Sequence, residues 1–458
     1  MSLTLLDVLR GSGGELASPQ PPETVFRRTV IDSREVQPGD LFVALKGERV
    51  DGNDFVPHAI ANGVAGVISS RPAGAIPNRV AFVQVPDTLR ALQDVARYKL
   101  RQVEPTVVGV TGTVGKTSTK EAIANALALK HRVLKTEKNY NTEIGVPLML
   151  LQLEPEHEMA VLEIGMYVPG DIRFLAELAR PRIGVVTGVS YVHAERVGTI
   201  ERIAEAKAEM VDGLGKDGVA VLNGDNQYTR AMKDRGHKAI LFGLEPENDV
   251  RALGVESHGL DGISFRLDYG GAIENVHLRT VGRHTAYHAL AAASVMLALG
   301  YSLGEAADAL RQAPTEALRL RVLAGKDQVT VIDDSYNSSP IAARAALTLL
   351  SEMPAGRQHV AVLGDMRELG QYSADQHRQV GAAAASLADL LVTVGEEALL
   401  IADGARSAGL PPDHVFATVQ PSEAVDFLRG RLQPGDYLLV KGSRAMGLEV
   451  IVREFAAS

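Results

Sequence analysis

The sequence predicts an α/β protein of three domains, with mainly parallel sheets in the second and third. Length is the first observation, because 458 residues at roughly 150 per domain favour about three domains. The second is that apolar runs of strand length recur along the chain and alternate with helical stretches. The third is a glycine-rich loop between such a run and a helix, at residues 107–120, which is typical of phosphate binding.

Residues 1–103 are expected to form a small N-terminal α/β domain. The β-rich runs LFVAL, AGVIS and VAFVQV alternate with turn clusters such as Gln37-Pro38-Gly39-Asp40 and Asp51-Gly52-Asn53. The pair Glu104-Pro105 then interrupts the pattern. We therefore place the first domain boundary between residues 103 and 104.

Residues 104–315 are expected to form the central domain. Its strand candidates are VVGVT, AVLEIGM, IGVVTGV and VAVLNGD, and their alternation with helices implies a parallel sheet covered on both faces. The glycine loop after the first strand predicts a P-loop-type ATPase domain. An alanine-rich helix over Thr285–Leu299 closes it, and it ends near Pro314.

Residues 316–458 are expected to form a smaller, Rossmann-like α/β domain. Its strand candidates are VTVIDD, HVAVLGD, LLVTVG and DYLLVKG.

Composition excludes several classes of protein. With 46% hydrophobic and 22% charged residues, the chain is an ordinary globular protein rather than a disordered one. Its formal charge of −9 disfavours a nucleic-acid partner, and the absence of cysteine excludes disulfides, thiolate metal sites and cysteine nucleophiles. The apolar helix at 289–299 is too short to cross a bilayer, and the start lacks the basic segment of a secretory signal. We expect a cytoplasmic protein without membrane insertion.

The strongest local signal is the loop in VVGVTGTVGKTSTK, residues 107–120. In such a loop, backbone N–H groups and a helix N-terminus point at phosphate, Lys116 can neutralise phosphate oxygens and Thr117 can bind Mg²⁺. Val110 stands where the strict P-loop pattern has glycine, so the match is to T-G-T-x-G-K-T. A glycine-rich turn with an incidental lysine is the alternative. The candidate ATP contacts are Gly112, Thr113, Gly115, Lys116, Thr117 and Ser118.

Other residues carry weaker signals when taken singly. Glu163 ends the run MAVLEIGM, and a triphosphate site needs a carboxylate near its metal ion, although strand-end glutamates are often only solvated. For His193 and Lys207, ordinary surface or core roles are the simpler interpretation. The polar cluster at 139–147 is consistent with an Asn-rich turn, and that at 333–340 with both a helix start and a ligand site after a strand.

In this order, the segments resemble the Mur ligase family, ATP-dependent enzymes that extend the peptide of the bacterial cell-wall precursor, and the resemblance covers essentially the whole chain. Asp32-Ser33-Arg34 and PGDLFVALKGERVDGNDF resemble the family's uridine-nucleotide-binding part. Segments of the central domain resemble the family's elements for ATP, Mg²⁺ and a carbamylated lysine. They are TGTVGKT, NYNTEIGVP, LEIGM, the His193 segment and AKAE around Lys207. In the third domain, three segments resemble the family member that adds D-alanyl-D-alanine: DDSYNSSP, VLGDMRELG and LVKGSR.

The resemblance implies a ligase that uses ATP to add D-alanyl-D-alanine to UDP-N-acetylmuramoyl-tripeptide through an acyl phosphate, forming the UDP-N-acetylmuramoyl-pentapeptide precursor of peptidoglycan. It also implies two Mg²⁺ ions, a carbamylated Lys207, domains that close around the substrates, and a monomer. The implied catalytic residues are Lys116, His193 and Lys207. The implied metal ligands are Thr117, Glu163, His193 and the Lys207 carbamate. Implied ATP contacts outside the loop are Asn141, Arg319, Asp334, Tyr336 and Asn337, and implied uridine-substrate contacts are Ser33, Arg34 and Lys46.

The sequence departs from the family pattern at several positions. Val114 stands where the family loop has asparagine, and Thr285 and His288 replace two asparagines near the end of the central domain. Leu318 replaces the glycine before the implied arginine, so Arg321 competes with it for that role.

Other functions stay open at this point: a ligase that adds the third peptide residue, a folylpolyglutamate-synthase-like ligase, or a nucleotide-binding regulatory module without ligation. The uridine-like segment disfavours the folate alternative, and DDSYNSSP disfavours the third-residue ligase. Whether the tripeptide ends in lysine or diaminopimelate does not follow from the sequence.

Overall fold

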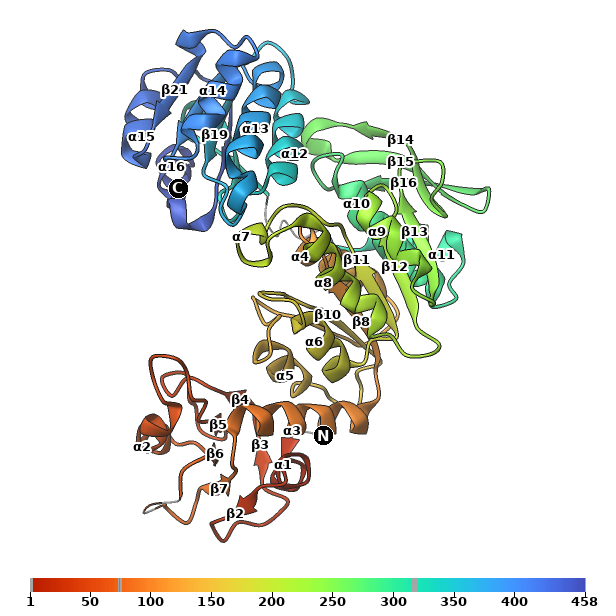
Figure 1. Ribbon diagram of the computed structural model, residues 1–458, viewed down its shortest axis with the longest axis vertical. Coiled ribbons are helices and arrows are strands. Elements are labelled where there is room, and N and C mark those ends of the chain that lie inside the picture. The colour runs from red at the N-terminus through yellow and green to blue at the C-terminus, as the bar shows by residue number, and fades with distance from the viewer. Residues whose placement is uncertain (1–2, 73, 75, 315–319, 458) are drawn as a thin grey trace.

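The computed structural model describes residues 3–72, 74, 76–314 and 320–457, and its larger sheets follow one another along the chain (Figure 1). The predicted three-domain α/β fold is confirmed. The boundaries themselves stay predictions. The first falls at the end of helix α3, and the second, between 315 and 316, lies outside the described residues.

The first domain contains a five-stranded sheet of order β2-β7-β6-β5-β4, parallel except for β2. Helix α3 ends where Glu104 adopts a left-handed φ of 51° ahead of Pro105. This helix packs against α5 of the central domain, where the Gln93 side chain donates to the Glu143 carbonyl at 3.1 Å. The strands are β1 (Leu3–Thr4), β2 (Glu15–Leu16), β3 (Val25–Phe26), β4 (Thr29–Val30), β5 (Leu41–Val43), β6 (Gly66–Ser69) and β7 (Ala81–Gln84). The helices are α1 (Leu5–Ser12), α2 (Val56–Ala61) and α3 (Thr88–Val103).

The central domain is built on a nine-stranded sheet of order β16-β15-β14-β13-β12-β11-β8-β10-β9. From β14 to β9 the strands are parallel, whereas β15 and β16 are antiparallel. The strands are β8 (Thr106–Thr111), β9 (Val133–Lys135), β10 (Met159–Glu163), β11 (Ile183–Val186), β12 (Val219–Asn223), β13 (Lys238–Gly243), β14 (Val250–Ser257), β15 (Ile263–Tyr269) and β16 (Ala272–Leu278).

Helices cover both faces of the parallel part of this sheet. Val107 of β8 joins one apolar cluster, with α5, α6 and α8, while Val108 and Val110 join another, with α4, α10 and α11. This alternation follows from the two-residue period of a strand. The helices are α4 (Lys116–Leu127), α5 (Gly145–Leu150), α6 (Asp171–Ala179), α7 (Ala194–Val197), α8 (Ile200–Asp212), α9 (Gln227–Ala231), α10 (Thr285–Ala298) and α11 (Leu303–Gln312).

The antiparallel β14–β16 extension differs from the simple parallel sheet that the sequence suggested. Its strands alternate buried and exposed residues, so only one face is covered, and they lack the continuous apolar runs of the parallel strands. Alternating strands of this kind give a weaker signal in the sequence than continuous apolar runs, and no strand is predicted at these positions from the sequence.

The third domain has a six-stranded sheet of order β17-β18-β22-β19-β20-β21, parallel except for β17. Helix α12 begins at Pro340, with Ser339 as the N-cap that accepts from the Ala342 N–H, as predicted. The strands are β17 (Arg321–Ala324), β18 (Thr330–Asp334), β19 (His359–Gly364), β20 (Leu390–Val394), β21 (Val415–Thr418) and β22 (Tyr437–Lys441). The helices are α12 (Pro340–Ser351), α13 (Ser373–Leu387), α14 (Leu399–Ser407), α15 (Pro421–Arg429) and α16 (Glu449–Phe455). Across the described part of the chain, every helix is too short or too polar to cross a membrane.

Candidate active site

The glycine loop joins β8 to α4 and requires glycine at two positions. Gly112 has a φ of 144°, and a Cβ there would lie 2.0 Å from the Thr187 hydroxyl oxygen. Gly115 has a φ of 84° and is the N-cap residue of α4. Because a side chain is disfavoured at both positions, the loop keeps its backbone close to whatever binds there.

Lys116, the first residue of α4, lies folded over this loop. Its Nζ donates to the carbonyl oxygens of Gly112 at 3.0 Å and Thr113 at 3.3 Å. The loop is tied to the next strand by Thr113, whose N–H donates to the Gly188 carbonyl and whose hydroxyl oxygen accepts from the Ser190 N–H. The ammonium charge is therefore held at the carboxyl edge of the sheet.

Glu163 is the buried centre of the arrangement, 4% exposed at the end of β10. Thr117 Oγ1 donates to Glu163 Oε2 at 2.8 Å, and Asn141 Nδ2 donates to Oε1 at 2.9 Å. The Glu163 N–H donates to the Thr136 hydroxyl oxygen at 2.9 Å. Because β8 and β10 are parallel neighbours, their carboxyl ends meet. The structure thus brings Thr117, Asn141 and Glu163 together, and their roles toward ATP and Mg²⁺ stay predictions.

Lys207, on α8, is fully buried, and its Nζ has no hydrogen-bond partner among the described residues. Burial holds the pKa of this amine well below its usual value, and the positive charge of Lys116 lowers it further. Glu209, Asp171 and Glu163 oppose this shift. A buried amine with a lowered pKa is neutral more readily than an exposed lysine.

The nearby acid Glu209 is engaged elsewhere. Its Oε1 accepts from the Gly170 N–H at 2.8 Å and its Oε2 from the Arg173 N–H at 3.0 Å, so both oxygens cap the start of α6. Glu205 and Glu209 are each two positions from Lys207 on α8, and the positions three and four residues away are apolar, so this helix offers Lys207 no glutamate partner.

His193 lies just before α7 and has a φ of 76°. Its Nδ1 is 2.7 Å from Oε2 of Glu368, a residue of the third domain. Burial lowers the pKa of His193, as do the charges of Lys207 and Lys116, whereas the contact with Glu368 raises it. The same contact lowers the pKa of the Glu368 carboxyl group. His193 and Lys207 thus occupy one electrostatic environment with Lys116.

These residues fit Mg²⁺ through oxygen atoms. No group of three or more histidine and acidic side chains in the described ranges is arranged as a metal centre. Mg²⁺, however, usually takes one or two protein carboxylates and completes its shell with water and substrate phosphates. The Thr117 hydroxyl and the Glu163 carboxylate match that pattern.

Among the predicted third-domain residues that the structure describes, Tyr336 contacts the central domain. Tyr336 Oη lies 3.2 Å from Nδ2 of Asn139, in the central domain. Asp334 pairs with the buried Lys441 at 2.5 Å, and Lys441 also donates to the Asn337 carbonyl at 3.0 Å. Arg319 lies outside the described residues.

The competing candidate, Arg321, forms an ion pair with Asp333 at 2.5 Å.

The predicted uridine-substrate contacts lie apart from these residues, in the first domain. Ser33 is buried, and its Oγ is 3.0 Å from Nδ1 of His58. Arg34 is exposed and pairs with Asp32 at 2.5 Å, and the Arg34 guanidinium lowers the pKa of that carboxyl group to about 2. Lys46 is exposed and pairs through its backbone with Asp51.

Family models match most of the chain. Residues 27–100 match "Mur ligase family, catalytic domain", residues 110–296 match "Mur ligase middle domain", and residues 318–444 match "Mur ligase, glutamate ligase domain". The UDP-N-acetylmuramoyl-tripeptide--D-alanyl-D-alanine ligase of Bacillus subtilis is 34% identical over 452 residues, which are 97% of this chain and 96% of that protein.

The chain belongs to the Mur ligase family. The resemblance inferred from the sequence is confirmed.

Solved structures of Mur ligases agree. MurF from Acinetobacter baumannii superposes with a TM-score of 0.89 at 30% identity, covering 99% of this chain and 98% of that one. MurF ligase from Thermotoga maritima in complex with ADP gives a TM-score of 0.81 at 31% identity, covering 93% of this chain and 96% of that one.

Two of the departures from the Mur ligase pattern lie at the loop, Val114 within it and His288 beside the helix that follows it. Nδ1 of His288 is 2.9 Å from the Thr119 hydroxyl oxygen, and a Cβ on Gly115 would come within 3.0 Å of the His288 ring. The Thr285 hydroxyl donates to the Gly282 carbonyl at 2.7 Å. The carbonyl of Val114 accepts from the Thr187 hydroxyl at 2.6 Å. Of these replacements, His288 thus bonds to α4 through its own side chain, whereas Thr285 bonds within its own turn and Val114 through its backbone.

Sequence reasoning missed two members of this site. Glu368 lies within the quoted segment VLGDMRELG, but nothing in its local pattern indicates contact with His193, 175 positions earlier. Thr136, whose hydroxyl oxygen receives the Glu163 N–H, lies on a short run without a motif.

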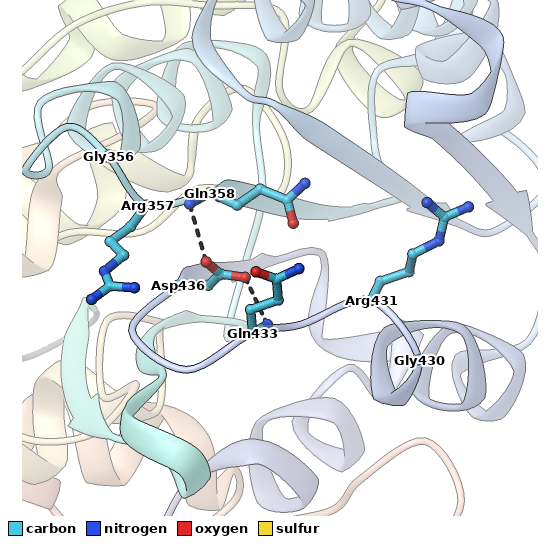
Figure 2. A pocket seen from close by; sticks show the side chains of 7 residues that line it. All are labelled: Gly356, Arg357, Gln358, Gly430, Arg431, Gln433 and Asp436. Carbon is cyan, nitrogen blue, oxygen red and sulfur yellow. Dashed lines mark hydrogen bonds between the residues drawn. The ribbon is translucent and has the colours of Figure 1, made fainter.

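A separate polar cavity of about 570 Å³ lies in the third domain (Figure 2). It is lined by turns at the amino ends of β19 and β22, and Asp436 accepts there from the backbone N–H groups of Gln358 and Gln433. The cavity contains none of the predicted site residues. In an open α/β sheet the ligand edge is the opposite one, so this cavity does not belong to the candidate active site.

Proposed function

We propose that the protein uses ATP to join D-alanyl-D-alanine to UDP-N-acetylmuramoyl-tripeptide, forming the UDP-N-acetylmuramoyl-pentapeptide. The observation that carries the proposal is the arrangement of Lys116, Thr117 and Glu163 at the glycine loop, in a chain that matches named tripeptide--D-alanyl-D-alanine ligases over nearly its whole length. ATP use is supported further by the ADP complex of the related Thermotoga maritima ligase.

The chemistry requires activation of a poor acyl donor. A carboxylate oxygen of the tripeptide attacks the γ-phosphorus of ATP, the bond from that phosphorus to the bridging oxygen breaks, and ADP leaves. The amine nitrogen of D-alanyl-D-alanine then attacks the acyl carbon, inorganic phosphate leaves, and the nitrogen loses its proton to a base. The first step brings two anions together, so its rate depends on fixed positive charge.

Lys116 and the loop supply that charge from the protein side. The loop N–H groups and the start of α4 face the phosphates, and the Lys116 ammonium group exchanges its carbonyl partners for phosphate oxygens. Asn141, fixed on Glu163 at 2.9 Å, lies beside the transferred group. Asp334, Tyr336, Asn337 and Arg319 bring the third domain onto the nucleotide.

We assign Thr117 and Glu163 as protein ligands of a first Mg²⁺. When bound, Mg²⁺ neutralises phosphate charge and aligns the reacting oxygens. The Thr117–Glu163 hydrogen bond holds both oxygen atoms at one edge of the sheet, 2.8 Å apart.

For a second Mg²⁺ we assign His193 and a carbamylated Lys207. A free ammonium group would repel the ion, whereas N-carboxylation of the neutral amine by CO₂ converts it to an oxygen ligand and releases one proton. Two observations support this assignment: Lys207 is fully buried, and its Nζ has no hydrogen-bond partner among the described residues. Buried polar groups normally have a partner, so an unpartnered amine is open to reaction with CO₂.

Substrate binding is distributed over the domains. The uridine nucleotide is assigned to the first domain, where its contacts are Ser33, Arg34 and Lys46. The phosphate loop and the third domain therefore have to approach a substrate that is held by a different domain. Productive geometry then requires the domains to close, and small-angle scattering should show a decrease in the radius of gyration when nucleotide and the amino-sugar substrate are added together. We also expect a cytoplasmic monomer.

One assay tests the proposed function against its alternatives. Phosphate release should require both UDP-N-acetylmuramoyl-tripeptide and D-alanyl-D-alanine, and mass spectrometry should detect the pentapeptide product. Phosphate release with UDP-N-acetylmuramoyl-dipeptide would indicate the ligase that adds the third peptide residue. Phosphate release with a folate would indicate the folylpolyglutamate-synthase-like ligase. Release with neither acceptor would indicate a simple NTPase. Tripeptides ending in lysine and in diaminopimelate, compared by kcat/KM, identify the third residue.

A further inference from the structure

The loop that carries His193 is packed against the third domain. Val192 belongs to the apolar cluster of that domain, and the rings of Tyr191 and Tyr372 lie 4.5 Å apart. A Cβ on Gly370 would come within 2.9 Å of the Glu195 backbone, so the two chain segments are in close contact. In Figure 1, α7 lies at the side of the central domain that faces the third domain.

Glu368 makes the polar contacts of this interface. Its Oε2 is 2.7 Å from Nδ1 of His193, and its Oε1 accepts from Arg196 Nη2 at 3.0 Å. Its carbonyl oxygen accepts from the Glu195 N–H at 3.4 Å. Glu368 also has a φ of 67°, a left-handed conformation that is unfavourable for glutamate. The interface therefore holds this side chain in place against a local conformational cost.

The contact determines which ring nitrogen of His193 is available. A carboxylate accepts hydrogen bonds only, so Nδ1 of His193 carries the hydrogen, and in the neutral ring Nε2 carries the lone pair. Carboxylates commonly orient metal-binding histidines in this way.

We propose that Glu368 is a positioning residue that fixes the tautomer and ring orientation of His193, so that docking of the third domain completes the metal site of the central domain. The proposal rests on the assignment of His193 to Mg²⁺ under the proposed function. The acid nearest in sequence, Glu195, is exposed and contributes only its backbone to this contact. The orienting carboxylate therefore comes from another domain, and phosphoryl transfer is restricted to the docked arrangement.

Three variants distinguish a role of Glu368 in orienting the His193 ring from a role in merely holding the two domains together. Glu368→Ala removes both side-chain contacts, and Glu368→Gln keeps an oxygen that can accept from Nδ1. Arg196→Ala removes the arginine contact of Glu368, together with the contact of Arg196 with the Tyr167 ring, and leaves the His193 contact. We expect Glu368→Ala to raise the Mg²⁺ concentration for half-maximal phosphate release about tenfold, Glu368→Gln to restore most of this loss, and Arg196→Ala to change it less than twofold.

The deciding measurement is independent of turnover. In protein labelled with ¹⁵N-histidine, with His193→Gln used to assign the signal, the parent and Glu368→Gln should show the Nδ1–H tautomer, and Glu368→Ala should show a mixture. An unchanged tautomer in a folded Glu368→Ala protein would overturn the proposal, as would equal Mg²⁺ effects of Arg196→Ala and Glu368→Ala. Failure of the parent to form the pentapeptide, with the tautomer still dependent on Glu368, would instead count against the proposed function alone.

Discussion

The phosphate loop and the candidate uridine site are built differently. At the loop, Glu163 is 4% exposed and receives hydrogen bonds from side chains of two other segments, and Lys207 is completely buried. In the first domain, the Arg34 side chain is 83% exposed and pairs with a residue two positions away. A step between two anions requires charges fixed in advance, whereas a binding handle can be held by exposed groups that reorganise. Substitutions in the first region should therefore lower kcat, and those in the second should raise KM.

The largest effect is expected at Lys116. Lys116→Ala removes the charge that the loop carbonyls hold at the phosphates, and we expect kcat to fall roughly 10³-fold at saturating substrates. Formation of the pentapeptide, followed by mass spectrometry, measures this. The control is Lys130→Ala, which removes an exposed lysine paired with Glu305 and should leave kcat unchanged. A Lys116→Ala protein as fast as the parent would remove the basis of the proposed mechanism.

Lys207→Ala should come next, with a loss of roughly 10²-fold in kcat because one oxygen ligand of the second ion disappears. Short carboxylic acids added to the assay should restore part of the rate by occupying the space of the missing carbamate. ¹³C-labelled bicarbonate should give a carbamate signal in the parent that is absent in the variant. Lys216→Ala removes an exposed lysine and serves as control. An unmodified amine in the active parent, without rescue of the variant, would count against the carbamate.

The first domain should behave differently. Arg34→Ala removes one exposed charged donor, and loss of a hydrogen bond of this kind, about 1.5 kcal/mol, should raise KM for the uridine substrate about tenfold and leave kcat unchanged. Arg90→Ala removes another exposed arginine of the same domain and should leave both constants unchanged. If Arg34→Ala lowered kcat at saturation instead, the first domain would take part in the chemical step, and the contrast between the two regions would be wrong.

The same contrast explains what the sequence could predict. The glycine loop, the strand that ends in Glu163 and the helix starting at Pro340 depend on local patterns, and the structure has each where it was expected. The approach of Glu163 to Thr117 at the glycine loop followed from the rule that parallel strands share a carboxyl edge, whereas Asn141 was indicated only by the resemblance to the Mur ligases.

Contacts between domains could not be predicted in this way. The approach of Glu368 to His193 depends on how two separately folded sheets dock, and no periodicity or spacing encodes that geometry. The β14–β16 extension was missed for a related reason, because a half-covered antiparallel strand has a weaker apolar signal than a buried parallel one.

The smallest expected effect concerns pH and again distinguishes the buried central region. Burial lowers the pKa of His284, Lys441 lowers it further, and Asp334 opposes this shift. Because the folded-state pKa lies below the unfolded value of about 6.5, the unfolded chain binds more protons at low pH. The neutral His284 ring therefore contributes its full stabilisation above the unfolded-state pKa. This stabilisation is lost as pH falls through the folded-state pKa, by at most about 1.4 kcal/mol per pH unit for one proton.

Denaturant midpoints at two pH values, one above and one below the ordinary histidine pKa, measure this loss. His284→Gln should reduce the difference between the two midpoints, but only in part, because burial lowers the pKa of His193 as well and gives it the same sign. His414→Gln, a change at a histidine with 46% side-chain exposure, is the matched control and should keep the difference found for the parent. An equal effect of both variants would mean that the acid sensitivity is not specific to the half-buried histidines His193 and His284, and that burial does not separate the two regions in this respect.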